Sequence, residues 1–374
     1  MEGVGLKPDD IQSIVDLAKI PVTSKDVLIE QQQTHLPFGG WLAVPPNTLR
    51  RIFISPGPIF DAQGNETVNV EAAAEAFQAV GIGPGDVVLN TFLYHLVPAG
   101  ILLDDGLAAA GATVVPTGPG NTDYQAQIAL GLRASGYIGT PSFLKIILDK
   151  IAEMNVPKAA VPIKKAFFTA EPYPQSLRDL FEGEYGMSTS QAYATADLGF
   201  IAYEQPGQPG MKVSKQLIVE IVNPETGQPV PSGEVGEVVC TTFNETYPLI
   251  RLGTGDLSAF TDEHKTHIRG WMGRVGDAIK VRGMFLHPAQ LKGALAAINS
   301  LENVQAVVTR PDSRDMLTLK VELADEAADK DTLVEQIKSA VQTACRLRID
   351  QVDFVAPASI AADARMIVDA RTWD

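Results

Sequence analysis

The order of two hydrophobic patterns along the chain limits its possible folds more than any other feature. In residues 1–277, strand-like apolar runs (RRIFISPGPIF, DVVLNTF, ATVVPTG, ASGYIGTP) alternate with stretches of helical spacing (EAAAEAFQAVG, PSFLKIILDKIAEM). This alternation predicts βαβ units and a parallel sheet. From residue 211 onward, short strands are separated by turn sequences such as Pro-Glu-Thr-Gly. That change predicts a small antiparallel β unit.

The last hundred residues predict a second, compact unit. His287–Ser300 has helical spacing, NVQAVVTR and MLTLKVELA are strand-like, and VDFVAP is a last short strand. Thr332-x-x-Glu335 predicts a capping box that opens another helix. The apolar face of that helix comprises Leu333, Ile337, Val341 and Ala344. The fold class is therefore α/β, with a large N-terminal domain at 1–276 and a small α+β C-terminal domain at 277–374.

The charge of the chain excludes several classes of partner. Thirty basic and 45 acidic residues give a formal net charge of −15. Residues 278–374 contain 12 basic and 14 acidic residues, a net charge of −2, and the rest of the chain carries −13. Such an acidic protein is poorly suited to nucleic acid or an anionic membrane surface. It also looks poorly suited to a polyanionic substrate, unless basic groups are placed locally.

Other features of the sequence predict a cytoplasmic protein. It has no uncharged apolar run of about 18 residues that could span a membrane. The first twenty residues carry acidic charges and lack the compact apolar block of a signal peptide. Cys240 and Cys345 are the only cysteines, so we expect neither a disulfide framework nor a tetrathiolate zinc site.

Three motifs in the first half of the chain have competing interpretations. GIGPGD (81–86) follows a helix and precedes a strand, so it predicts a helix end and turn rather than a dinucleotide site. ISPGPIF follows a strand, where Ser55 and Gly57 could present a hydroxyl and backbone N–H groups to an anion; a plain proline-rich turn is the alternative. Tyr94 and His95 form a polar pair at a strand end, where they could line an apolar or aryl pocket or be satisfied in the core.

The strongest signal is RLGTGDLS (251–258) followed by GWMGRVGDAIKVRG (270–283). Gly-Thr-Gly-Asp places Asp256 on a tight turn, where its carboxylate can accept two hydrogen bonds from a diol such as a nucleotide ribose. Arg274, Asp277, Lys280 and Arg282 follow within a few residues, at the predicted domain joint. Together, in this order and spacing, the two segments indicate a nucleotide site.

With these segments, the sequence resembles the phenylacetate–coenzyme A ligase branch of the adenylate-forming (acyl-CoA synthetase) superfamily. The resemblance covers nearly the whole chain, through PDDIQSIVDLAKIPVTSKDVL, PFGG, SPGPIF, GYIGTPSFLK, TAEPYPQSLR, QAYATADLGFIAYE, EVGEVV, YPLIRLGTGDLS and GRVGDAIKVRGMFLHP. It implies an ATP-dependent, AMP-forming acid–CoA ligase for an aryl or other small apolar carboxylic acid. The implied cofactors are ATP/AMP, Mg²⁺ and coenzyme A, and members are often homodimers. The branch usually has a longer N-terminal segment, so we expect a truncated or naturally short form.

The resemblance also implies roles for individual residues. Asp256 would bind the ribose, and Arg274 the ribose and phosphate. Asp277 would be the hinge of a mobile C-terminal domain, and Lys280, Arg282 and Gly283 would lie on the loop that reaches the site in the thioester-forming pose. The remaining implied positions are Ala170, Glu171 and Pro172 on adenine, Tyr193, Ala194 and Thr195 beside it, Asp197 for Mg²⁺, and Tyr94, His95, Gly139, Thr140 and Pro141 in the acyl pocket.

The chain departs from the family pattern at three places. The phosphate loop reads SPGPIFDAQG and has no lysine, and the usual hydroxyl and glutamate of the next motif are Ala196 and Asp197. Asp363 stands where a late catalytic lysine is expected, with Arg365 two residues on. An anion in place of that cation should raise the barrier by several kcal/mol, at about 1.36 kcal/mol per tenfold in rate.

Three interpretations therefore stay open. Arg365 could replace the lysine in an active ligase. Alternatively, the chain is a catalytically impaired nucleotide- or acyl-CoA-binding member of the fold. In the third interpretation, the acyl-adenylate is transferred to an acceptor other than CoA.

Overall fold

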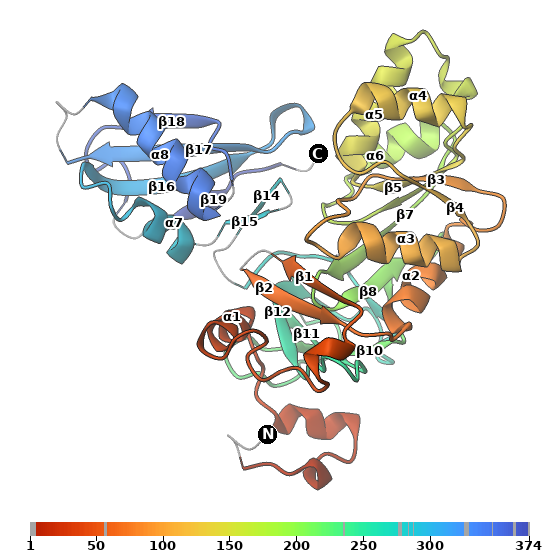
Figure 1. The fold of residues 1–374 in the computed structure, drawn as a ribbon, viewed down its shortest axis with the longest axis horizontal. Helices are drawn as coiled ribbons and strands as arrows, with labels where there is room; N and C mark the ends of the chain where they lie inside the picture. The colour runs from red at the N-terminus through yellow and green to blue at the C-terminus, as the bar shows by residue number, and fades with distance from the viewer. Residues whose placement is uncertain are drawn as a thin grey trace. The chain divides into compact units, whose positions relative to one another are not determined.

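The chain divides into two compact units, Met1–Val275 and Gly276–Asp374. A computed structural model (Figure 1) describes residues 5–55, 58–234, 236–275, 279–282, 284–286, 288–324, 329–345, 347–361 and 364–372. Among these residues, no helix has the length and apolar character needed to cross a bilayer.

An eight-stranded mixed sheet forms the centre of the first unit. Its order is β13-β9-β8-β7-β6-β5-β3-β4; neighbours from β7 to β4 are parallel and those from β7 to β13 are antiparallel. The strands are β3 (Val87–Asn90), β4 (Thr113–Pro116), β5 (Gly136–Gly139), β6 (Lys165–Phe168), β7 (Ser188–Thr195), β8 (Gly199–Glu204), β9 (Met211–Val213) and β13 (His267–Ile268). The predicted parallel βαβ arrangement is confirmed for β3 to β6.

Helices cover both faces of this sheet because its central strands are apolar on both sides. Phe167 packs with α2 (Val68–Ala79) and α3 (Ala99–Ala109), whereas the adjacent Phe168 packs with α4 (Thr122–Gly131), α5 (Pro141–Glu153) and α6 (Gln175–Arg178). Figure 1 shows the two helix groups on opposite sides of the strands. The predicted apolar stripe of α5 is confirmed, since Leu144, Ile147, Leu148 and Ile151 are buried.

Two antiparallel sheets complete the first unit. β10 (Leu217–Val222), β11 (Gly236–Thr242) and β12 (Leu252–Ser258) form the predicted antiparallel unit. RRIFISPGPIF was expected to supply a strand of a βαβ unit, and this prediction was wrong. It forms β1 (Arg51–Ser55) and the start of β2 (Ile59–Gln63), which pair as a separate hairpin. The connection between them is three residues long, far too short for a parallel crossover.

One apolar core joins these small sheets to the first helix. Leu28 of α1 (Lys25–Thr34) and Ile59 of β2 share a buried cluster with Tyr193 and Leu198, at the ends of β7 and β8. The polar residues on these elements are thereby brought near one another. Single-turn and irregular helices lie at Pro8–Asp10, Ile14–Lys19, Pro46–Thr48, Lys158–Ala160, Asp179–Glu184 and Pro311–Ser313.

The second unit is a four-stranded sheet of order β18-β17-β16-β19 with two helices. Its elements are the hairpin β14 (Ile279–Val281) and β15 (Met284–Leu286), α7 (Pro288–Leu295), β16 (Leu301–Thr309), β17 (Met316–Leu323), α8 (Lys330–Cys345), β18 (Gln351–Phe354) and β19 (Ile367–Asp369). The predicted helix–strand–strand–helix–strand order is present, with β14, β15 and β19 in addition.

Two details of α8 differ from the sequence prediction. Asp329 caps its N-terminus by accepting hydrogen bonds from Asp331 N (3.2 Å) and Thr332 Oγ1 (2.6 Å), so Thr332 lies inside the helix and is not the cap. The buried face continues to Cys345 and not to Ala344. Residue 345 lies four positions after Val341, so it falls on the same face of the helix.

Candidate active site

The GTGD turn starts from a strand that is fixed by a buried ion pair. The side chain of Arg251, on the turn before β12, is 1% exposed, and its Nε lies 3.0 Å from Oε2 of Glu220 on β10. The same guanidinium donates to the carbonyl oxygens of Gly227 (2.7 Å) and Ile20. A buried charge needs such partners because its desolvation is costly. Arg251 therefore ties the start of β12 to β10 and to the N-terminal segment.

Three side chains hold the carboxylate of Asp256. The Tyr193 hydroxyl lies 3.0 Å from its Oδ2, and Trp271 Nε1 donates to its Oδ1 over 3.2 Å. Arg274 Nε lies 3.0 Å from the same Oδ1. The structure thus brings together three residues that the sequence predicts for nucleotide binding: Tyr193, Asp256 and Arg274. Trp271 was not predicted.

Backbone pairing explains how Trp271 and Arg274 reach Asp256. The segment 271–275 runs antiparallel to β12: Leu257 N donates to the Gly273 carbonyl (2.9 Å), and Val275 N donates to the Gly255 carbonyl (2.7 Å). Gly255 has a φ of +71°, a conformation that favours glycine. A sequence signal for Trp271 existed in the conjunction of GTGD and GWMGR, but the register was needed to choose this residue.

Tyr193 keeps its proton in this environment. Burial raises the pKa of Tyr193 well above its usual value, and the Asp256 carboxylate raises it further. The hydroxyl can therefore donate to Asp256, and it also lies 3.1 Å from Thr254 Oγ1. The next two predicted residues hold the end of β7. Ala194 pairs with Phe200 on β8, and Thr195 Oγ1 accepts a hydrogen bond from Leu198 N (3.2 Å).

The predicted adenine loop contacts the start of α5. Glu171 Oε1 accepts a 2.7 Å hydrogen bond from Ser142 N, in the first turn of that helix. A carboxylate is favourable there because unpaired N–H groups and the helix dipole face it. Ala170 has a φ of +76°, which turns the chain towards Pro172. Thr140 caps the same helix by accepting from Phe143 N (3.3 Å). The segments 170–172 and 139–141 therefore adjoin each other.

Gly139 lies in a tightly packed position at the end of β5. A Cβ there would lie 2.1 Å from Tyr137 Oη and 2.2 Å from Thr91 Oγ1, so only glycine fits. Pro141, two residues later, is buried at the first position of α5, where proline is favourable because its missing N–H costs nothing.

Tyr94 and His95 occupy different environments. Tyr94 Oη donates to Asp104 Oδ2 (2.7 Å) and accepts from Asn90 Nδ2 (2.8 Å), and burial followed by Asp104 raises the pKa of this phenol. Its hydroxyl thus fastens the 91–96 loop to α3. His95 is exposed. This loop also contacts β1, because Ile54 N donates a hydrogen bond to the Leu96 carbonyl oxygen (2.7 Å).

A second polar cluster lies at Asp61 and Asp197. Ser55 Oγ donates to Asp61 Oδ2, and Lys25 of α1 pairs with Asp197, whose side chain is fully buried. Burial, followed by the charge of Asp197, raises the pKa of Asp61 to about 8. Oδ1 of Asp61 and Oδ1 of Asp197 accept no hydrogen bond within the described structure.

These buried oxygens fit a hard divalent cation such as Mg²⁺, which prefers carboxylate and hydroxyl ligands. The sequence predicts Ser55 and Asp197 as site residues, but it does not indicate Asp61 or Lys25. The available signal for Asp61 was its place among apolar residues on an inward-facing strand position.

The structure describes the remaining predicted residues only in part. Gly57, Asp277, Gly283 and Asp363 lie outside the described residues, and Lys280 is described only by its backbone in β14. Arg282 has its guanidinium 3.0 Å from both carboxylate oxygens of Asp350. Arg365 is exposed, and its carbonyl accepts from Gln305 Nε2 (3.0 Å).

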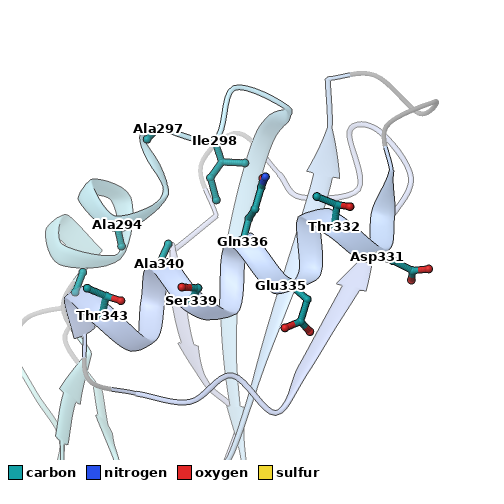
Figure 2. A pocket seen from close by; sticks show the side chains of 11 residues that line it. Ala294, Ala297, Ile298, Asp331, Thr332, Glu335, Gln336, Ser339, Ala340 and Thr343 are labelled. Carbon is teal, nitrogen blue, oxygen red and sulfur yellow. The ribbon is translucent and has the colours of Figure 1, made fainter.

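An open hollow of about 930 Å³ lies between α7 and α8 in the second unit. Figure 2 shows its lining, in which Ala294, Ala297 and Ala340 accompany the carboxylates of Asp331 and Glu335. The described residues of this lining include no cation, so they do not suit the phosphates of ATP or CoA. The Asp256 cluster is the better candidate for nucleotide binding.

Comparison with known proteins shows which proteins this chain is similar to. Residues 283–371 match the AMP-binding enzyme C-terminal domain. The phenylacetate-coenzyme A ligase of Thermus thermophilus is 29% identical over 348 residues, 87% of this chain and 76% of that protein. The Aromatoleum evansii phenylacetate-coenzyme A ligase is 28% identical over 360 residues, 91% and 81% of the two chains. A solved structure of 2-hydroxyisobutyryl-CoA ligase, in complex with 2-HIB-AMP and CoA, matches with a TM-score of 0.89 at 26% identity, covering 99% of this chain and 84% of that one. The chain is therefore similar to phenylacetate-coenzyme A ligases over most of its length, and its fold matches that of 2-hydroxyisobutyryl-CoA ligase.

Proposed function

We infer that the protein is an ATP-dependent, AMP-forming acid–CoA ligase. The observation that carries this inference is the Asp256 carboxylate, held at the GTGD turn by Tyr193, Trp271 and Arg274. In the first step, the substrate carboxylate attacks the α-phosphorus of ATP and expels pyrophosphate, leaving an acyl-adenylate. In the second step, the CoA thiol attacks the acyl carbon and expels AMP.

The Asp256 cluster is proposed to bind the nucleoside and α-phosphate. Asp256 would accept hydrogen bonds from the ribose hydroxyls, and Arg274 beside it would contact the ribose and the phosphate, where charge increases during the first step. Tyr193 and the loop of Ala170, Glu171 and Pro172 would contact the adenine. This assignment is supported by the placement of Tyr193 against Asp256.

Mg²⁺ is proposed to bind at Asp197. When bound, it would neutralise charge on the phosphate oxygens. Ser55 and the backbone at Gly57 would orient the phosphates, and Arg365 would supply the cation that the late lysine provides elsewhere in the family. Support for the metal position comes from Oδ1 of Asp197, which is buried and accepts no hydrogen bond within the described structure.

The acyl substrate is proposed to be an aryl or other small apolar acid. Its pocket would be lined by Tyr94, His95 and the segment 139–141. The exposure of His95 suggests that this residue lies at the pocket entrance.

The division at 276/277 is proposed to separate the large domain from a mobile lid that swings about Asp277. Lys280, Arg282 and Gly283 would then approach the site for thioester formation. For this role, the Arg282 guanidinium must leave Asp350. We also propose a cytoplasmic location, consistent with two free and buried cysteines, and a homodimer, which size-exclusion chromatography with light scattering would test.

Two sequence features favour a second candidate, a nucleotide-binding protein with little turnover. The SPGPIFDAQG loop has no lysine, and Asp363 stands where a catalytic lysine is expected. Both changes remove positive charge from the phosphates, so adenylation would be slowed more than nucleotide binding.

A single assay separates the two candidates. The protein is incubated with ATP, Mg²⁺, CoA and a panel of aryl and short aliphatic acids, and AMP release is measured, with Asp256→Ala as the negative control. AMP formation with one of the acids supports the ligase. Silence across the panel, while calorimetry shows intact AMP binding, favours the binding protein. Undiminished activity in Arg365→Ala would rule out Arg365 as the substitute cation.

A further inference from the structure

Asp61 and Asp197 come from separate elements and are both buried. Asp61 is on β2 and is 7% exposed, and the side chain of Asp197, in the turn after β7, is fully buried. β2 and the residues flanking that turn share one apolar core with α1. The charge of Asp197 acts on Asp61, as does that of Lys25. The three groups therefore form one cluster, within reach of the Ser55 hydroxyl.

The donors within this cluster are too few for its acceptors. Lys25 pairs with Asp197 Oδ2, and Ser55 donates to Asp61 Oδ2. Oδ1 of each carboxylate is buried without a hydrogen-bond donor among the described residues. Two carboxyl groups share this buried site with one ammonium group, so a charge on both of them is balanced only if a further cation is present.

We propose that Asp61 and Asp197 together bind the divalent cation that accompanies ATP, and that Lys25 occupies this position in the empty protein. When the metal binds, the Lys25 ammonium is released towards the triphosphate. This inference rests on the proposed ligase function, which assigns the metal to Asp197 alone.

Charge balance supports the exchange. A divalent cation balances both carboxylates in their ionised forms, whereas the single charge of Lys25 balances only one. Mg²⁺ and Mn²⁺ favour carboxylate oxygens, so the free Oδ1 atoms supply ligands that an ammonium group does not use. The released lysine would also supply a positive charge to the phosphates, which the SPGPIFDAQG loop cannot do because it contains no cation. Lys25 lies in the first turn of α1 and is partly exposed.

The proposal is tested with the full chain and Mn²⁺ alone, by electron paramagnetic resonance of the free ion. We expect one bound Mn²⁺ in the wild type. Asp61→Asn should weaken its binding at least tenfold, and Lys25→Met should strengthen it at least threefold because the competing cation is gone. Asp26→Asn removes an exposed carboxylate beside Lys25 and should leave Mn²⁺ affinity unchanged.

The opposite effects of the two variants distinguish a metal site from a structural cluster. Circular dichroism and the urea midpoint check that each variant is folded. Mn²⁺ affinity that is unchanged in Asp61→Asn, or weakened in Lys25→Met, overturns the proposal, as does a wild type that binds no Mn²⁺. If Asp61→Asn fails the folding check, Lys25→Met alone decides. Because the assay contains no ATP, acid or CoA, its outcome is independent of whether AMP is released in the ligase assay.

Discussion

The two carboxylate sites of the large unit differ in how many of their oxygen atoms accept hydrogen bonds from the protein itself. Asp256 has donors on both oxygens, from Tyr193, Trp271 and Arg274. Asp61 and Asp197 each have a buried oxygen without a hydrogen bond from the described residues. The first site is therefore built before its ligand arrives, whereas the second is completed by one.

This difference predicts opposite relations between stability and binding. A preorganised site loses affinity when a supporting group is removed, and the fold weakens or is unaffected. An incomplete site destabilises the metal-free protein electrostatically. Neutralising one of its carboxylates therefore stabilises the fold, while metal binding is lost. Four substitutions test the contrast, from the largest expected effect to the smallest.

Arg251→Met should destabilise the large unit by about 3–5 kcal/mol, because it leaves the buried Glu220 charge without its partner. The urea midpoint measured by tryptophan fluorescence reports the change. Arg348→Met is the matched control, since its side chain is 77% exposed beside Asp350, and should cost under about 1 kcal/mol. Equal effects of the two substitutions would refute a scaffold role for Arg251.

Asp256→Ala should lower AMP affinity roughly 100-fold, because two hydrogen bonds from the ribose to a charged acceptor are lost. Calorimetry measures the change directly. Asp149→Ala, on the outer surface of α5, serves as the control and should bind AMP as the wild type does. Retention of wild-type affinity in Asp256→Ala would contradict both the nucleotide site and the proposed function.

Asp61→Asn should stabilise the metal-free protein at pH 8 by about 1–2 kcal/mol more than at pH 6. The pKa of Asp61 is about 8 in the fold and 3.8 as its ordinary value, so between pH 4 and 8 the folded state retains a proton that the unfolded state has lost. Wild-type stability therefore falls as pH rises through this window, by at most about 1.4 kcal/mol per unit. The groups acting on Asp61 are Asp197, Ser55 and Lys25.

The measurement is urea unfolding of wild type and Asp61→Asn in a chelating buffer at both values of pH. The asparagine has no charge to lose, so its unfolding free energy should change less. A stability difference between the two proteins that does not depend on pH would show that Asp61 is already ionised in the fold.

Trp271→Phe should have the smallest effect, a loss of about 1 kcal/mol or some fivefold in AMP affinity. It removes the indole donor to Asp256 Oδ1 while it keeps an aromatic ring, and one hydrogen bond is worth about this much. Calorimetry is the suitable measurement, because the substitution removes a tryptophan and would change a fluorescence signal by itself. An effect as large as that of Asp256→Ala would mean that the indole itself contacts the nucleotide.

Local patterns predicted much of this molecule. The apolar stripe of α5 and the parallel strands follow from spacing alone, and the GTGD motif identified Asp256. The remaining features depend on how separate elements pack together, which local patterns do not report. Asp61 and Asp197 meet only because the β1–β2 hairpin packs on the β7–β8 end, and Lys25 joins them from α1. The hairpin itself was missed because a proline-rich turn resembles a strand-to-loop transition.

The most direct test of the contrast between the two sites compares AMP and Mg²⁺–ATP binding in one variant, Asp61→Asn. Under the proposed function, AMP binds at the Asp256 site alone, whereas Mg²⁺–ATP uses both sites. We predict that calorimetry will give an AMP affinity within twofold of the wild type and a Mg²⁺–ATP affinity at least tenfold weaker. Equal changes in both affinities, or no change in either, would contradict the account.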